Sequence, residues 1–135
     1  MIDQWYLANI EILRRIWGFV EYDDESLTWI RILNFELPSV YYQEDTTLLF
    51  TTPGYNIENF RDYNFFVDQN LIRLDGIAPP FVHENNECNS LYNHGYARLS
   101  FHLKSFRPTP DIVSGDNFLE LAKAVYHFLG QEEVS

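Results

Sequence analysis

Apolar side chains recur at helical spacing over residues 2–20. They line one side of a helix, and Asn9 is the one gap in that stripe. The periodic stretch ends at Gly18 and the acidic cluster 23–25, because glycine weakens a helix and a run of like charge favours solvent. The pattern predicts an N-terminal helix followed by a loop.

Three later stretches contain the β-branched and aromatic residues that are typical of strands. The first, residues 27–37, alternates partly and places Ile30 and Ile32 opposite Phe35. The second, residues 46–52, ends at Pro53-Gly54, a pair that favours a turn. The third covers residues 63–67 and is followed by residues 71–74, which form either another short strand or an irregular arm.

The last part of the chain is irregular and then helical. Residues 82–93 are mostly polar and lack periodicity, which predicts a long surface loop of the kind that often carries function. An aromatic-rich stretch follows at residues 96–103. Apolar residues recur at helical spacing over residues 118–129, with Ser114 or Asp116 as the predicted N-cap and Gly130 as the stop.

The order of these elements predicts an α+β fold in a single domain over residues 1–135. Consecutive strands joined by short turns form an antiparallel meander, and the helices outside that run cover the sheet. A chain of 135 residues with 46% apolar residues is of the size expected for one packed core.

The charge balance excludes several kinds of partner. Nine Lys and Arg stand against 20 Asp and Glu, and the net charge of −11 repels phosphate backbones and anionic lipid surfaces. We therefore expect no nucleic-acid and no membrane partner. The chain begins without a basic, apolar leader pattern, and its single cysteine cannot form an internal disulfide, so a cytoplasmic location is expected.

The polar loop holds the candidate chemistry. His83, His94 and His102 bracket Cys88, but their spacings match no compact metal site, and the chain has no phosphate-binding or dinucleotide motif, so neither metal nor cofactor is predicted. A thiol near histidines can serve as a nucleophile. The alternative is a chance cysteine in a tolerant loop, and the neighbouring Glu84 and Glu87 favour it because negative charge raises a thiol pKa.

Short motifs stand in a defined order along the chain. They are the segments 32–38, Leu48-Leu49-Phe50 with Pro53-Gly54-Tyr55, Phe65-Phe66-Val67-Asp68, and residues 95–108 with Ser100, His102 and Phe106-Arg107-Pro108. This order resembles the ubiquitin-conjugating superfamily, and specifically its bacterial branch, the prokaryotic family E, over residues 28–129. The resemblance implies a helix packed on a four-stranded antiparallel meander, an irregular active-site stretch and a C-terminal helix.

The resemblance also implies an activity and two partners. Such a protein accepts a ubiquitin-like protein from an activating enzyme as a cysteine thioester and passes it to an amine. Cys88, the only thiol, would form the thioester, and His102 would assist proton transfer, orient the loop or make a structural hydrogen bond. Candidate donors to the oxyanion are the amides of the same loop, Asn85, Asn86, Asn89 and Asn93.

Departures from the family pattern leave other functions open. The His-Pro-Asn tripeptide that usually precedes the catalytic cysteine is absent, and Asp68-Gln69-Asn70 stands nearest its place. Counting from Gly95 puts Ala97 at the usual cysteine position. A noncatalytic binding module on the same fold is therefore an alternative. A small acidic immunity or inhibitor protein that neutralises a basic toxin is another, based on size and charge.

Overall fold

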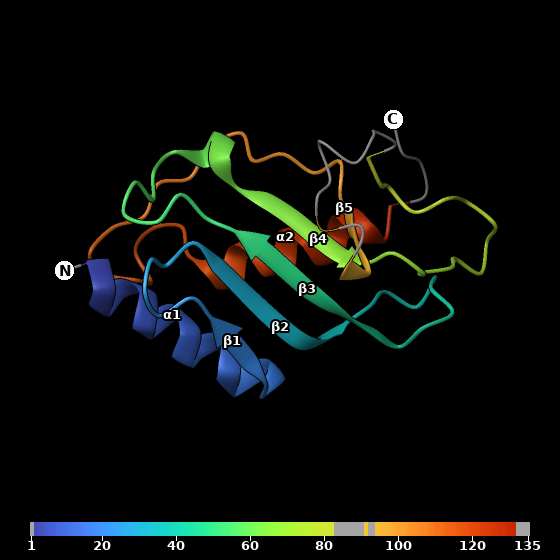
Figure 1. Cartoon of the computed structure of the whole chain (residues 1–135), viewed down its shortest axis with the longest axis horizontal. Helices are drawn as coiled ribbons and strands as arrows, with labels where there is room; N and C mark the ends of the chain where they lie inside the picture. The colour runs from blue at the N-terminus through green and yellow to red at the C-terminus, as the bar shows by residue number, and fades with distance from the viewer. Residues whose placement is uncertain (1, 83–90, 92–93, 132–135) are drawn as a thin grey trace.

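The helices and strands follow the predicted order in the computed structural model, which describes residues 2–82, 91 and 94–131 (Figure 1). The elements are α1 (Ile2–Trp17), β1 (Val20–Tyr22), β2 (Trp29–Glu36), β3 (Asp45–Thr51), the 3-10 helix η1 (Phe60–Asp62), β4 (Asn64–Asp68), β5 (Tyr96–Arg98) and α2 (Phe118–Leu129). The chain is thus an α+β protein with a helix at each end of a run of strands.

The described strands form one antiparallel sheet in the order β1-β2-β3-β4-β5. The expected antiparallel meander is confirmed, but the described sheet has five strands rather than four. Strand β1 lies where the sequence predicted a loop, and it pairs Val20 with Ile32 and Tyr22 with Ile30. Three residues are too few to show an alternating pattern, so this strand is defined by its pairing with β2.

The face assignment within β2 needs correction. Ile30, Ile32 and Phe35 are all buried in the same core, although strict alternation places Phe35 on the opposite face. The register between β2 and β3 shifts between Ile32 and Phe35. An additional residue in one strand reverses the alternation beyond it, which returns Phe35 to the core side.

Both helices pack on the core face of the sheet. The ring of Phe118, from α2, lies 5.4 Å from that of Phe50 in β3 and 5.2 Å from that of Tyr6 in α1. In Figure 1, α2 passes behind the sheet and α1 runs beside β1. The core therefore lies between the sheet and a layer of two helices that are far apart in sequence.

Asn9, the polar gap in the apolar stripe of α1, joins the two helices. Its side chain is buried, its Nδ2 donates to the Trp5 carbonyl at 2.9 Å, and its Oδ1 accepts from the backbone N–H of Phe118 at 2.8 Å. The first N–H groups of a helix have no partner within the helix. Asn9 therefore satisfies one such group of α2 from the neighbouring helix.

The N-cap of α2 is Asn117, not the predicted Ser114 or Asp116. The Asn117 side chain accepts from the backbone N–H of Glu120 at 3.0 Å. The carboxylate of Asp116 instead accepts from the Arg107 backbone N–H, and Ser114 Oγ donates to Asp111. The two predicted caps are thus used within the preceding loop, while the predicted stop at Gly130 is confirmed.

Residues 71–74 form an irregular arm rather than a further strand. A single antiparallel bridge joins Arg73 to Tyr41. The Arg73 side chain is fully buried and donates two hydrogen bonds to Asp75, one to the Leu129 carbonyl at 3.2 Å and one to the Gln131 carbonyl at 2.6 Å. Arg73 therefore fixes the C-terminal end of α2 to the arm.

Two core tyrosines predict alkaline sensitivity. Burial raises the pKa of Tyr6 from 10.0 to about 12, and burial also raises the pKa of Tyr63, whose hydroxyl donates to the Ile57 carbonyl. An unfolded tyrosine ionises near pH 10, so the contribution of these phenols is present below that pH and is lost as the pH rises through the folded-state values. We expect the free energy of unfolding, measured in urea, to fall as the pH is raised above about 10.

A pair of variants separates this effect from general alkaline damage. Tyr63→Phe should reduce the loss of stability between pH 9 and pH 11. Tyr42→Phe, at a side chain that is 74% exposed, should leave that loss unchanged. An identical loss of stability in both variants would contradict the assignment.

Candidate functional site

The β5 edge of the sheet is the first candidate site. On one side β5 pairs with β4, and Gln69 N donates to the Gly95 carbonyl at 2.9 Å. On the other side Val82 N donates to the Arg98 carbonyl at 2.8 Å, and Ser100 N donates to the Pro80 carbonyl at 2.9 Å. The described residues on both sides of the predicted polar loop therefore lie beside β5.

The predicted nucleophile and oxyanion donors lie outside the described residues. Cys88, Asn85 and Asn89 fall within residues 83–90, and Asn93 falls within residues 92–93. These assignments remain predictions from the sequence. The described residues before and after these stretches lie at β5: Val82 hydrogen-bonds to Arg98, and Gly95 directly precedes the strand.

His102 is accessible close to β5. Its side chain is exposed, and within the described part of the chain no hydrogen bond or ion pair involves its ring. The preceding residue, Phe101, packs between the sheet and α2, with its ring 5.1 Å from those of both Phe65 and Phe128. Phe101 therefore anchors the backbone while the next side chain, the imidazole of His102, faces solvent.

Ala97 lies where no nucleophile could act. It is 2% exposed, lies in the middle of β5 and pairs with Val67 of β4, which faces the core. A thiol at this position would be buried under the helices. Counting from Gly95 therefore leads to a core position.

Strand β4 ends at the segment that stands nearest to the place of the absent His-Pro-Asn tripeptide. Asp68 is the last residue of the strand, and its carboxylate accepts from the Thr47 backbone N–H at 3.3 Å. Gln69 and Asn70 follow in an exposed turn. This turn lies next to the start of β5, because Gln69 hydrogen-bonds to Gly95.

The outer face of the sheet carries a charged bridge to β5. Arg31 of β2 donates to the Glu21 carboxylate of β1 at 2.8 Å, and its interactions with Tyr96 of β5 and with Glu21 raise the pKa of its guanidinium. The guanidinium also lies over the Trp29 ring, 5.6 Å from its centroid. Tyr96 is thereby held on the face of the sheet opposite the helices.

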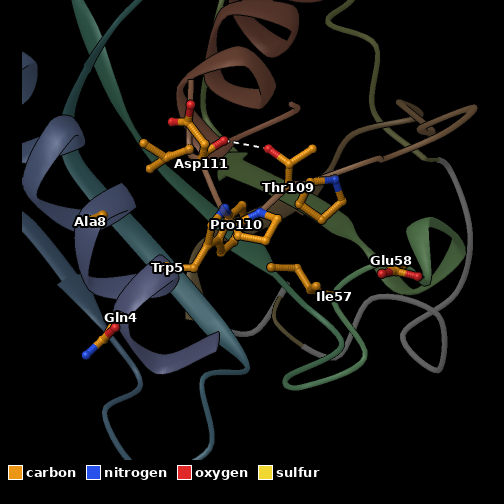
Figure 2. A pocket seen from close by; sticks show the side chains of 10 residues that line it. Gln4, Trp5, Ala8, Ile57, Glu58, Thr109, Pro110 and Asp111 are labelled. Atoms are coloured by element: carbon orange, nitrogen blue, oxygen red, sulfur yellow. Dashed lines mark hydrogen bonds between the residues drawn. The ribbon is translucent and has the colours of Figure 1, made fainter. Parts of the chain in front are cut away.

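A pocket of about 640 Å³ is the second candidate site (Figure 2). It is lined by Trp5 and Ala8 of α1, by residues 57–58, and by residues 108–112. Figure 2 shows Trp5 lying beneath Pro110, with Ile57 beside them. The sequence analysis did not identify this pocket, although the rigid Pro108-Thr109-Pro110 segment was a signal that part of its wall is fixed.

Two features, a cluster of metal ligands and a membrane-spanning helix, are absent from residues 2–82, 91 and 94–131. These residues contain no group of three His, Cys, Asp or Glu side chains that could hold a metal ion. None of the helices in this part of the chain has the length and apolar character needed to cross a membrane.

Comparison with protein-family models, with curated proteins and with solved structures finds no match to this chain. Its function is therefore inferred from its own residues. The two candidate sites are the β5 edge with His102 and the pocket between α1 and the Pro108-Thr109-Pro110 segment.

Proposed function

We propose that this chain is a ubiquitin-conjugating-like protein that accepts a ubiquitin-like protein as a thioester on Cys88 and passes it to an amine. The order of the described elements supports the proposal, because an N-terminal helix, an antiparallel meander and a C-terminal helix follow one another. The Pro53-Gly54 turn directly follows β3, as the resemblance implies.

The single observation that carries the proposal is the geometry of the β5 edge. Two residues flank the stretch containing Cys88: Val82 hydrogen-bonds to Arg98 on the outer side of β5, and Gly95, directly before β5, hydrogen-bonds to Gln69 on the β4 side. The exposed His102 follows the same strand closely in sequence. An accessible imidazole that follows a cysteine-bearing stretch in the chain supports the proposal, because thiol-based acyl transfer uses a base of this kind to move protons.

The proposed chemistry has two acyl transfers. In the first, the Cys88 thiolate attacks the thioester carbonyl of the incoming ubiquitin-like protein, and the cysteine of the activating enzyme leaves as a thiolate. In the second, an acceptor amine attacks the new thioester, Cys88 leaves as a thiolate, and His102 takes the proton from the amine. The loop asparagines Asn85, Asn89 and Asn93 would donate hydrogen bonds to the oxyanion in both steps.

The test is adduct formation with purified components. The protein is incubated with the cognate activating enzyme, its ubiquitin-like protein and ATP, and the products are separated without reductant. We expect an adduct that thiol reductant cleaves, an oxyester that resists reductant for Cys88→Ser, and no adduct for Cys88→Ala. Absence of an adduct with the native chain, while the activating enzyme charges itself, contradicts the proposal.

His102 has a matched control in His127, which is also exposed but lies in α2. His102→Ala should slow transfer from the thioester to an amine by about 10²-fold, the usual contribution of a general base. His127→Ala should leave the rate unchanged. Equal rates in the two variants would remove His102 from the chemistry.

A noncatalytic binding module on the same fold is the second candidate. The core position of Ala97 and the absence of the His-Pro-Asn tripeptide favour it. This alternative predicts saturable binding of the ubiquitin-like protein, measured by calorimetry, with equal affinity for the native chain and Cys88→Ala and with no covalent adduct.

A further inference from the structure

The pocket beside α1 has a wall that is fixed before any ligand binds. The loop formed by residues 107–117 is closed at its neck, where Asp116 N donates to the Arg107 carbonyl at 3.0 Å and the Asp116 carboxylate accepts from Arg107 N at 2.8 Å. Within the loop, Thr109 Oγ1 donates to the Asp111 carbonyl at 2.6 Å. A preformed wall lowers the entropic cost of binding.

Close packing at Gly115 shows how tightly the loop is closed. A Cβ atom added to Gly115 would lie 2.7 Å from the Arg107 carbonyl oxygen and 2.9 Å from Thr109 N. Both are backbone atoms, so the loop cannot accept a side chain there without shifting. The loop therefore has little freedom to collapse into the pocket.

A neighbouring hollow shares part of the pocket's wall. It is lined by residues 55–59, so Ile57 and Glu58 line both. Two adjoining hollows can receive more than one side chain of a bound segment. Trp5, which lines the pocket and is only 7% exposed, has an indole N–H with no hydrogen-bond partner among the described residues. Because this N–H is itself buried in the wall, its signal reports on packing at the pocket.

The charged lining residues of the pocket are both acidic. Glu58 and Asp111 line it together with apolar side chains, and none of the described Lys or Arg residues does. Hydrogen bonds from Ser114 and from Val113 N lower the pKa of Asp111, so this carboxylate stays ionised. In Figure 2 the two acidic side chains lie on opposite sides of Ile57. Positive charge on either side of an apolar group would complement this arrangement.

We propose that this pocket docks an extended segment of a partner protein in which an apolar side chain is flanked by Lys or Arg. The apolar side chain packs between Trp5, Ile57 and Pro110, and the flanking cations face Glu58 and Asp111. The proposal is independent of the thioester chemistry, because neither β5 nor His102 lines the pocket.

The probe is the peptide acetyl-Gly-Arg-Leu-Arg-Gly-amide, added to the ¹⁵N-labelled full chain at about 20 mM salt, where screening is weak. Trp5→Phe identifies the indole N–H signal of Trp5 in the NMR spectrum. We expect a saturable shift of this signal, with the signals of Trp17 and Trp29 unchanged. The charge-reversed peptide acetyl-Gly-Glu-Leu-Glu-Gly-amide should cause no shift.

Three variants test the mode of binding. Glu58→Gln should weaken the Arg peptide about threefold, the effect of one exposed ion pair. Glu36→Gln, at an exposed carboxylate outside the pocket, should not change the affinity. Ala8→Leu, which fills the pocket from α1 and preserves helix propensity, should abolish the shift.

Three results would overturn this proposal: no saturable shift, equal binding of the two peptides, or native-like binding by Ala8→Leu. Each of them can be distinguished from failure of the thioester reaction. The peptide titration contains neither the activating enzyme nor a ubiquitin-like protein, so its outcome does not depend on thioester formation.

Discussion

Replacing Phe118 with alanine is expected to destabilise the protein by about 4 kcal/mol, the cost of removing a large aromatic side chain from a packed core. Phe118 is fully buried at the first turn of α2. Its ring lies 5.1 Å from Trp5, 5.2 Å from Tyr6, 5.4 Å from Phe50 and 6.2 Å from Phe106. The substitution therefore removes contacts with both α1 and the sheet.

The free energy of unfolding from urea titrations measures this effect. Phe19→Ala is the matched control, because Phe19 is 65% exposed and its loss should cost no more than about 0.5 kcal/mol. The near-ultraviolet circular dichroism of Phe118→Ala should also weaken, since four aromatic neighbours lose a packed partner. A cost below 1 kcal/mol for Phe118→Ala would mean that the helices do not share this core.

Replacing Arg73 with methionine should cost about 3 kcal/mol, because a buried charge is removed from a hydrogen-bonded pair and main-chain acceptors lose their donor. At the C-terminal end of α2, the Gln131 carbonyl would lose its Arg73 hydrogen bond, and the Leu129 carbonyl would keep only the hydrogen bond from the Tyr41 hydroxyl. The partner carboxylate, Asp75, is one-third exposed, so water can solvate its remaining charge.

Arg15→Met is the control for this effect. Arg15 pairs with Glu11 on the surface of α1, and both side chains are mostly exposed. An exposed pair of this kind contributes at most about 0.5 kcal/mol. Hydrogen exchange should show faster opening of the last turn of α2 in Arg73→Met alone. Equal urea midpoints for the two variants would be incompatible with an anchoring role for Arg73.

The Cys88 and His102 site stays a prediction from the sequence. Of these two residues the structure describes His102 alone, as an exposed side chain close to β5. The pocket could not be predicted, because Trp5, Ile57 and Pro110 belong to three distant segments. No local pattern indicates that such segments meet.

The sequence by itself determined the two helices and the strands β2 and β3. Periodicity of 3.6 residues gives an element one apolar face, and this signal needs only near neighbours along the chain. The Pro53-Gly54 pair likewise ends β3 through local backbone geometry.

Tertiary structure decided the features that depend on a distant partner. Strand β1 exists through its pairing with β2, Phe35 returns to the core through a register shift against β3, and Asn9 binds the first N–H of α2. Each requires a hydrogen bond or contact between segments whose separation in sequence gives no periodic signal. Such features follow from how the whole chain satisfies its buried polar groups while it packs one core.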